Sequence, residues 1–332
     1  MSQNPNTNNI FVTGAAGYIG GITSIELFRK GYNVYGVDRR TVPHLNSFFK
    51  EILTCDFTDY ETLLLLKRIK PAAIIHCAGT SLVGPSMQYP GVYFDNNVSR
   101  TNRLLNFLKD ELPNTKFIFS SSASVYGNYS NNPYREYMDK NPVSPYGESK
   151  LMVENILKWF NQCHNLNFVS LRYFNACGAD PYSIHGQEPN ATHIFAKLFE
   201  AANNNKPFIM NGSDYKTKDG TCIRDYIHVT DIAEAHIKSI EGDFTGFYNL
   251  GTYKGHSNLE CLQQVEKITN KKIQVNFDSR REGDPALLIA DPTKFESKTL
   301  WKAWRTLPMI VKHLKDWYSS DTYKSLINNK RS

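Results

Sequence analysis

Hydrophobic and polar positions along the first half of the chain follow two alternating periods. Short runs rich in β-branched and aromatic residues stand at 10–12, 33–37, 73–75, 117–119 and 168–171. Between these runs, apolar residues recur at helical spacing over 18–30, 59–69, 93–108 and 145–163. Strands that alternate with helices are typical of a parallel sheet covered by helices on both faces. We therefore expect an α/β fold with a doubly wound parallel sheet of the Rossmann type.

The pattern changes after Gly178, where the chain becomes irregular and rich in Pro, Asn and Gly. Helical spacing returns only at 191–202, 258–269 and 307–318. We expect three parts: a loose polar tail at 1–9, the Rossmann domain at 10–178, and a smaller C-terminal domain at 179–332 that binds the substrate. Residues 225–250 are expected to return to the first domain.

Composition and charge narrow the class of protein. Of the 332 residues, 41% are hydrophobic and 21% are charged, which is ordinary for a globular chain. The net charge of +6 is spread along the chain, whereas a nucleic-acid surface would gather its basic residues. The longest aliphatic run, at 63–66, is far shorter than the roughly 18 apolar residues that a membrane span needs. Because the N-terminus also has no leader pattern, we expect a cytoplasmic protein that binds neither nucleic acid nor a membrane.

Neither the cysteines nor the histidines form a pattern typical of a metal site. The six cysteines include no C-x-x-C pair, so they favour neither a zinc site nor a disulfide framework. His76 stands at a strand end and His228 close to Asp225, but no third ligand lies at a recognisable spacing. We interpret both histidines as structural and predict no bound metal.

A glycine-rich turn follows the first predicted strand. Its glycines are spaced three apart, at Gly14, Gly17 and Gly20. Such a turn lets the backbone approach a pyrophosphate and directs a helix N-terminus at it. Asp38 ends the second predicted strand, where a carboxylate accepts hydrogen bonds from the adenosine ribose and repels a 2′-phosphate. The pattern therefore favours NAD, although Arg39 and Arg40, which follow directly, would suit the phosphorylated cofactor.

The predicted helix at 145–163 carries a candidate proton-transfer site. Tyr146 and Lys150 are four residues apart and therefore lie on one face of that helix. A phenol with a pKa near ~10 acts as a base at neutral pH only if a nearby positive charge favours the phenolate. Lys150, together with the positive ring of an oxidised nicotinamide, would supply that charge. The serine-rich stretch at 120–124 ends a predicted strand on the side where such sheets bind ligands, so one hydroxyl there can bond a substrate alcohol beside Tyr146.

These motifs together resemble the extended short-chain dehydrogenase/reductase superfamily and, within it, the UDP-glucose 4-epimerases. The resemblance runs from Ile10 to about Trp304. The motifs that carry it are TGAAGYIG (13–20), IIHCAG (74–79), YFDNNV (93–98), FSSSASVYG (119–127), SPYGESKLMVE (144–154), LRYFNACGADP (171–181), RDYIHV (224–229), YNLG (248–251) and RREGDPA (280–286). Dehydratase relatives usually carry an Asp-Glu pair where this chain has Ala123 and Ser124, so the resemblance favours the epimerases.

The resemblance implies a role for individual residues of this chain. Ser122 and Tyr146 would transfer the substrate proton, and Lys150 would bind the nicotinamide ribose and activate Tyr146. The residues implied to contact NAD are Gly14, Gly17, Tyr18, Ile19, Gly20, Asp38, Asp56, Phe57, Ala78, Gly79, Asn96, Tyr146, Lys150 and Phe174. The residues implied to contact the UDP-sugar are Ser122, Asn175, His193, Ile194, Arg224, Arg281, Asp284 and Leu287.

The resemblance also implies an activity, a cofactor and an assembly. The chain is expected to be a homodimeric, NAD-dependent epimerase that inverts C4 of a UDP-hexose through a 4-keto intermediate. Leu287, or its neighbour Leu288, stands near the position where relatives restricted to plain hexoses carry Tyr, so we expect activity on the N-acetylated pair as well. Two features depart from the family pattern: the short loop after Asp38, and Ser81, where many relatives carry Lys.

Other readings stay open at this point. The chain could be a UDP-uronate or UDP-pentose epimerase, a dehydratase or a reductase of the same superfamily. It could also be a non-catalytic regulator that senses NAD. The intact set of Ser122, Tyr146 and Lys150 argues against a regulator, which has no need of a tuned base.

Overall fold

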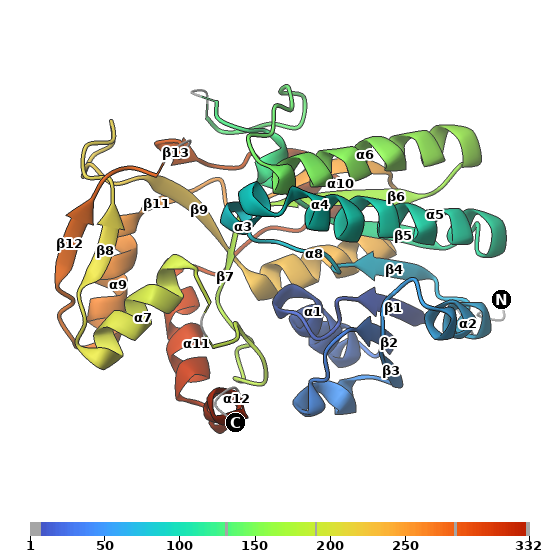
Figure 1. Ribbon diagram of the computed structural model, residues 1–332, viewed down its shortest axis with the longest axis horizontal. Coiled ribbons are helices and arrows are strands. Elements are labelled where there is room, and N and C mark those ends of the chain that lie inside the picture. The colour runs from blue at the N-terminus through green and yellow to red at the C-terminus, as the bar shows by residue number, and fades with distance from the viewer. Residues whose placement is uncertain (1–7, 130–131, 190, 282–283, 330–332) are drawn as a thin grey trace.

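A seven-stranded parallel sheet forms the centre of the computed structural model, which describes residues 8–129, 132–189, 191–281 and 284–329 (Figure 1). Its strand order is β10-β6-β5-β4-β1-β2-β3, and each neighbouring pair is parallel. The strands are β1 (Asn9–Thr13), β2 (Asn33–Asp38), β3 (Glu51–Thr54), β4 (Ala73–His76), β5 (Lys116–Ser122), β6 (Phe168–Tyr173) and β10 (Gly246–Leu250). The predicted doubly wound parallel sheet is therefore confirmed.

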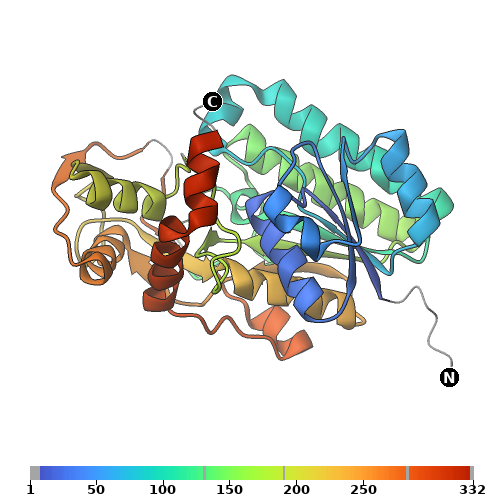
Figure 2. The ribbon, with the colours of Figure 1, turned by 90° about the horizontal axis from the view of Figure 1, so that it is seen from below.

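Helices cover both faces of this sheet. One face carries α2 (Tyr60–Ile69), α5 (Arg100–Glu111) and α6 (Pro145–His164), and the other carries α1 (Tyr18–Arg29) and α8 (Val229–Glu241). Figure 2 shows α1 and α8 side by side in front of the sheet. Along β1, Phe11 packs under the first group of helices, while Ile10 and Val12 pack under the second. Because both faces are buried, the strands read as continuous apolar runs.

The structure adds elements that the periodicity does not predict. The four residues of the edge strand β3 are all half-buried or exposed. Because an edge strand need not be apolar throughout, its sequence does not contain the apolar run that predicts the other strands. The segment predicted as one helix over 93–108 is divided into α4 (Pro90–Tyr93), a π-helical turn (Phe94–Ser99) and α5. Three short helical segments also surround the sheet: η1 (Pro43–Phe48), α3 (Val83–Gln88) and η3 (Ala123–Val125).

The C-terminal part forms a second, smaller body beside the sheet (Figure 1). Its strands are β7 (Asn175–Cys177), β9 (Ile223–His228), β11 (Gly255–Ser257) and β13 (Leu287–Leu288) in one sheet, and β8 (Phe208–Asn211) with β12 (Val275–Asp278) in another. Its helices are α7 (Ile194–Asn204), α9 (Asn258–Thr269), α11 (Leu307–Ser319) and α12 (Asp321–Asn329), while α10 (Thr293–Thr299) lies against β10. These helices bury a separate core that includes Leu198, Val265 and Trp317.

The chain crosses between the two bodies more than once. After β9, which belongs to the smaller sheet, α8 and β10 pack on the large one. We propose the two bodies as two domains with the boundaries given above, except that β7 and β9 belong to the sheet of the smaller one. The predicted tail at 1–9 falls mainly on residues 1–7, which lie outside the described residues. Within the described ranges, no helix combines the length and apolar character needed to cross a membrane.

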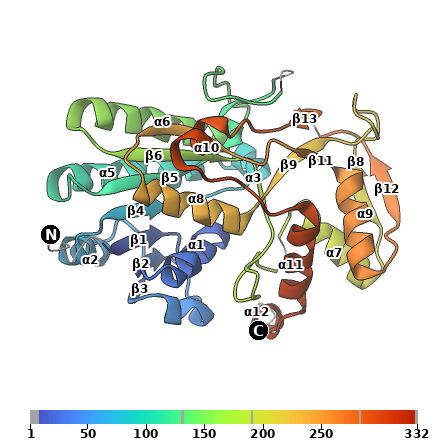
Figure 3. The ribbon, with the colours of Figure 1, turned by 180° about the vertical axis from the view of Figure 1, so that it is seen from behind.

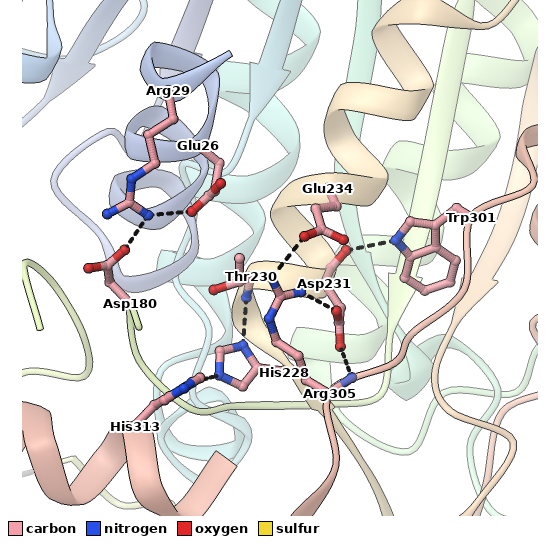
Figure 4. Close-up of polar contacts among 10 residues, drawn as sticks. All are labelled: Glu26, Arg29, Asp180, His228, Thr230, Asp231, Glu234, Trp301, Arg305 and His313. Carbon is pink, nitrogen blue, oxygen red and sulfur yellow. Dashed lines mark hydrogen bonds and ion pairs between the residues drawn. The ribbon is translucent and has the colours of Figure 1, made fainter. Parts of the chain in front are cut away.

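Buried polar contacts join the two bodies on the side of α8 (Figure 4). Arg305 is paired with Asp231 and lies 2.9 Å, from Nη2 to Oε1, from Glu234. Within the smaller body, at the end of β9 where the chain passes into α8, His228 Nε2 lies 2.9 Å from His313 Nδ1 of α11, so His228 has a structural partner. Such contacts fix how the smaller body sits against the sheet.

Candidate active site

The glycine-rich turn after β1 is packed too closely for side chains. Gly14 has a φ of +67°, and a Cβ there would come within 2.7 Å of the Ala78 amide nitrogen. A Cβ at Gly20 would come within 2.1 Å of the Gly14 carbonyl oxygen. Helix α1 begins directly after Gly17, which has no side chain to cap it. The turn can therefore bring its backbone against an anion at the helix N-terminus.

A cavity of ≈ 520 Å³ opens at the carboxyl ends of β1, β2 and β4. Eight of the residues predicted to bind the cofactor line it, namely Gly14, Gly17, Asp38, Asp56, Phe57, Ala78, Gly79 and Asn96. Its lining also includes Val37, Arg39, Arg40, Cys55, Cys77, Thr80, Ser81 and Leu82. A larger hollow of ≈ 750 Å³ near Arg135 and Lys294 contains none of the predicted site residues, so the chemistry points to the smaller one.

The acid at the end of β2 is held by backbone amides and by Arg40. Asp38 Oδ2 accepts a hydrogen bond from the Ala16 amide at 3.1 Å, and Oδ1 accepts one from the Arg40 amide at 3.0 Å. The Arg40 guanidinium lies 3.5 Å from Asp38 Oδ1 and is also paired with Glu188. Two carboxylates thus balance the charge of Arg40, which makes it less suited to a 2′-phosphate.

The cavity is lined by a second acid, Asp56. Arg100 Nη1 lies 2.5 Å from Asp56 Oδ2, and Thr58 donates to Oδ1 from its amide and its hydroxyl. Although burial opposes it, these bonds hold the pKa of Asp56 below its ordinary value. Phe57 meets the edge of His76, with ring centroids 4.9 Å apart.

His76 is a buried structural histidine. Its Nδ1 lies 2.8 Å from Thr13 Oγ1, and its Nε2 lies 2.9 Å from Thr101 Oγ1. Burial, with a smaller effect of Lys150, lowers the pKa of His76 to about 3. The ring is therefore neutral at physiological pH, and both of its nitrogens are occupied.

Helix α6 places Tyr146 and Lys150 one turn apart. The helix starts with Pro145 after Ser144, whose hydroxyl caps it by accepting from the Gly147 amide at 3.1 Å. Lys150 Nζ lies 5.9 Å from the centroid of the Tyr146 ring and donates to the Ser120 carbonyl at 2.9 Å. The three predicted catalytic residues come from α6 and from the end of β5, where Ser122 caps η3.

Burial dominates the electrostatics of this pair. Burial raises the pKa of the Tyr146 phenol, an interaction with the Ser122 side chain partly opposes this, and Tyr93 adds to it. Burial likewise lowers the pKa of Lys150 to about 8. Lys150 thus lies near Tyr146 as predicted, while burial is the largest effect on the pKa of the phenol. A positive charge beside Tyr146 would oppose this effect by favouring the phenolate.

Asn97 is a buried residue behind the cavity lining that the sequence analysis missed. Its side chain accepts from the Thr80 amide at 2.7 Å and donates to Ser149 Oγ of α6 at 2.9 Å. A Cβ at Gly79 would come within 3.0 Å of Asn97 Oδ1 and 3.6 Å of Lys150 Nζ. Asn97 therefore fixes the cavity lining against the catalytic helix. The signal in the sequence is the pair of asparagines in the YFDNNV motif, of which the family resemblance points only to Asn96 as a contact of NAD.

A buried ion pair supports α6 from behind. Arg172 of β6 contacts both carboxylate oxygens of Glu154, with Nη2 2.6 Å from Oε2 and Nε 2.9 Å from Oε1. Arg172 also donates to the Tyr126 hydroxyl at 2.7 Å, which donates in turn to Asn249. This network joins the catalytic helix to three segments of the first body.

The predicted substrate residues fall into two groups. Arg224 is buried on β9, and its Nη2 lies 2.5 Å from Asp284 Oδ1. Asn175, on the adjacent strand β7, donates to the Asp225 carbonyl at 3.2 Å. By contrast, Arg281 is exposed and donates to Asn211 at 3.2 Å. His193 is exposed at the start of α7, where Ile194 is the first helical residue.

The remaining predicted residues lie around the two ends of the site. Tyr18 donates through its hydroxyl to the Gly178 carbonyl at 2.6 Å, while Ile19, the next residue of α1, packs against the core between α1 and the sheet. Phe174 belongs to an apolar cluster with Ala123, Tyr126 and Tyr134, next to Ser122. Leu288 packs against this cluster, while the Leu287 carbonyl accepts from Asn132 at 3.3 Å.

Comparisons with known proteins extend over nearly the whole chain. The family described as NAD dependent epimerase/dehydratase matches residues 10–251. UDP-glucose 4-epimerase of Bacillus subtilis is 37% identical, over 95% of this chain and 99% of that protein. The Brucella ovis UDP-glucose 4-epimerase in complex with NAD superposes with a TM-score of 0.88 at 35% identity, over 94% of this chain and 98% of that one. The Bifidobacterium longum enzyme in complex with NAD⁺ and UDP gives 0.85 at 34% identity, over 95% and 99%.

Proposed function

We infer that this chain, which belongs to the NAD dependent epimerase/dehydratase family and within it to the UDP-glucose 4-epimerases, is an NAD-dependent enzyme that inverts C4 of a UDP-hexose. The observation that carries this inference is the position of Tyr146, Lys150 and Ser122. A cavity-lining turn at Gly79 lies beside Lys150 Nζ, so the proton-transfer site adjoins the nucleotide cavity. The residue roles below are our proposal.

The cavity suits a dinucleotide. We propose that the Gly14–Gly17 turn receives the pyrophosphate and that Asp38 bonds the adenosine ribose. Bound NAD supplies the hydride acceptor for C4 and, once reduced, the donor that returns the hydride. The pairing of Arg40 with Asp38 and Glu188 supports NAD over its 2′-phosphorylated form.

Tyr146 is the proposed base. It removes the proton of the C4 hydroxyl and later returns it to the alcohol of the opposite configuration. Ser122 hydrogen-bonds the same oxygen from the end of β5. Because burial raises the pKa of Tyr146, we expect Lys150 and the positive ring of the cofactor to act together in favouring the phenolate.

Inversion at C4 requires the sugar to turn while the nucleotide stays anchored. Binding energy must therefore be placed on UDP and not on the hexose. Arg224 is the proposed anchor of the diphosphate, since a planar guanidinium matches phosphate oxygens. Asp284 already holds this guanidinium in one orientation.

Incubation with UDP-galactose, and separately with UDP-N-acetylgalactosamine, tests the function. We expect the 4-epimer in each reaction, resolved by chromatography, with no accumulation of free NADH. Accumulated NADH or a dehydrated product would indicate a reductase or dehydratase instead. If neither substrate nor the uronate and pentose analogues react, the chain is not an epimerase, and the regulator hypothesis gains support.

The two arginines assigned to UDP should differ in effect. We expect Arg224→Met to raise the Kd for UDP about 10–100-fold, the cost of losing a charge-assisted bond in a buried site. Arg281→Met, its exposed counterpart, should change the Kd less and in a more salt-sensitive way. Titration calorimetry at two salt concentrations measures both, and the NAD content serves as the control. Equal, unchanged affinities would show that neither arginine holds the diphosphate.

One of two leucines is proposed to wall the sugar pocket. Leu288 packs against the cluster beside Ser122, which supports it over Leu287. We expect Leu288→Tyr to slow the N-acetylated reaction selectively, through an overpacking cost of about 1–3 kcal/mol. Leu287→Tyr is the matched variant, and kcat/KM on both substrates is the measurement. If both activities fall equally in both variants, neither leucine controls the size of the accepted sugar.

Assembly and location are also proposals. We propose a homodimer in the cytoplasm, supported by the family resemblance. The UDP-sugar substrate is the partner that we propose for the site residues. Light scattering on the purified protein measures the assembly directly.

A further inference from the structure

A short segment of the C-terminal body, residues 178–188, runs between α1 and α11 (Figures 1 and 3). We call it the strap. It is folded around the fully buried carboxylate of Asp180. Arg29 of α1 donates to Oδ1 at 2.6 Å, as Figure 4 shows, and the amides of Tyr182 and Ile184 donate to Oδ2 at 3.0 and 3.1 Å. The strap is therefore a built turn that is tied to α1.

At the centre of the strap, one histidine contacts the glycine-rich turn and is itself bonded to a second histidine, His44 of η1. His185 Nε2 lies 3.2 Å from the Gly17 carbonyl oxygen, and His185 Nδ1 lies 3.1 Å from His44 Nε2. A carbonyl can only accept, so Nε2 of His185 carries the hydrogen and Nδ1 accepts from His44. The fit is tight, because a Cβ at Gly21 would come within 2.6 Å of the His185 ring.

The two ends of the strap reach both sides of the nucleotide cavity. At one end, the Gly178 carbonyl accepts from the hydroxyl of Tyr18, the first residue of α1. At the other end, Glu188 pairs with Arg40, which lines the cavity and whose amide binds Asp38. The strap thus connects the turn after β1 with the loop after β2.

Helix α11 supports the strap from behind. The indole of Trp317 donates to the Gln187 carbonyl at 2.8 Å. A Cβ at Gly186 would come within 2.6 Å of the same ring. Since Trp317 is fully buried in the core of the smaller body, the strap cannot move away from α1 without disturbing that core.

We propose that the strap is a latch that holds the two walls of the nucleotide cavity together and so retains the cofactor through both hydride transfers. The proposal rests on the proposed function, because an epimerase must return the hydride from the same cofactor molecule. The strap is bonded to both the glycine-rich turn and the Asp38–Arg40 loop, so it opposes any separation of these two walls of the cavity. His185 acts as a positioning residue: it contacts Gly17 and has no part in the chemistry.

The test measures how fast NAD leaves the protein. His185→Phe keeps a ring of similar shape but removes both hydrogen bonds, and Asp180→Asn removes the charge that pairs with Arg29. NAD-loaded protein is diluted without substrate, and the NAD that remains bound is followed over time by rapid gel filtration. We expect each variant to lose NAD about 10-fold faster or more, which corresponds to the loss of one buried hydrogen bond. Turnover at saturating NAD should stay near wild type.

Asp231→Asn is the matched control. It weakens another buried pairing between the two bodies, with Arg305, but it does not touch the cavity (Figure 4). It should lower the melting temperature while leaving NAD release at the wild-type rate. The latch proposal is wrong if Asp231→Asn accelerates NAD release as much as the strap variants do. It is also wrong if His185→Phe and Asp180→Asn release NAD at the wild-type rate. If those two variants do not fold, the milder Glu188→Gln decides by the same readout.

The experiment separates the latch from the function on which it rests. NAD release is measured without a sugar nucleotide, so it stays informative if the wild type epimerises nothing. An inactive wild type that retains NAD, with variants that release it, would refute the epimerase and keep the latch. If the wild type is active and all variants release NAD at an unchanged rate, the epimerase is supported and the latch is refuted.

Discussion

Replacing Tyr146 with phenylalanine should lower epimerase turnover by about 10²–10⁴-fold, the range expected when a positioned general base is lost. The aromatic ring remains in place on α6, so the affinity for UDP and the content of NAD should stay close to wild type. Steady-state assays with UDP-galactose measure the turnover, and calorimetry measures the UDP affinity. Near-normal turnover would remove Tyr146 from the mechanism.

Tyr93→Phe is the matched control for that experiment. The Tyr93 ring lies 6.4 Å from the Tyr146 ring, between centroids, and its hydroxyl donates to the Leu82 carbonyl at 2.5 Å. This variant removes the same chemical group, a phenolic hydroxyl, from the same neighbourhood, but Tyr93 has no proposed role in proton transfer. We expect a loss of stability of about 0.5–1.5 kcal/mol, typical of one hydrogen bond, and a turnover within a few-fold of wild type.

Replacing Glu154 with glutamine should destabilise the protein by about 3–5 kcal/mol, because it leaves the Arg172 charge buried without a balancing partner. Glu154 and Arg172 have side-chain exposures of only 2% and 3%. Ser121 and Ser170 also donate to the same carboxylate, at 2.7 and 3.1 Å, so three groups lose an anionic acceptor at once. Chemical denaturation with fluorescence detection measures the free energy of unfolding.

Two further variants make this result specific. Glu200→Gln removes a carboxylate from an exposed pair with Lys197 and should change stability by less than about 0.5 kcal/mol. The double variant Glu154→Leu with Arg172→Met removes both buried charges and should recover much of the loss. If Glu154→Gln costs no more than the exposed control, the buried pair does not stabilise α6 as we describe.

The parts of the site that could be predicted are those whose requirement is local. Gly20 is needed because a Cβ there would come within 2.1 Å of the Gly14 carbonyl oxygen in the same turn of the chain. The Tyr146 and Lys150 pair follows from the period of a single helix. Both features can be read from fewer than ten consecutive residues, together with the elements on either side.

The parts that could not be predicted depend on contacts between distant segments. Lys150 is held by the carbonyl of Ser120, thirty residues away, and His185 contacts Gly17 across 168 positions. Nothing in the neighbourhood of His185 indicates such a partner. The shift of the Tyr146 pKa also depends on burial, which is a property of the assembled fold and not of the YGESK motif.

The return of the chain to the large sheet has a consequence for biosynthesis. The face of α1 that bears Ile22 packs against Val229 and Ala233 of α8, and β6 is covered at the sheet edge by β10. When the ribosome has released residues 1–178, the apolar surfaces of α1 and β6 are still uncovered. The elements that cover them, α8 and β10, are complete only when Leu250 has been released. At roughly 5–20 residues per second, this interval lasts several seconds. The nascent Rossmann half should therefore bind chaperones during that time, and a fragment ending at residue 178 should aggregate when expressed alone.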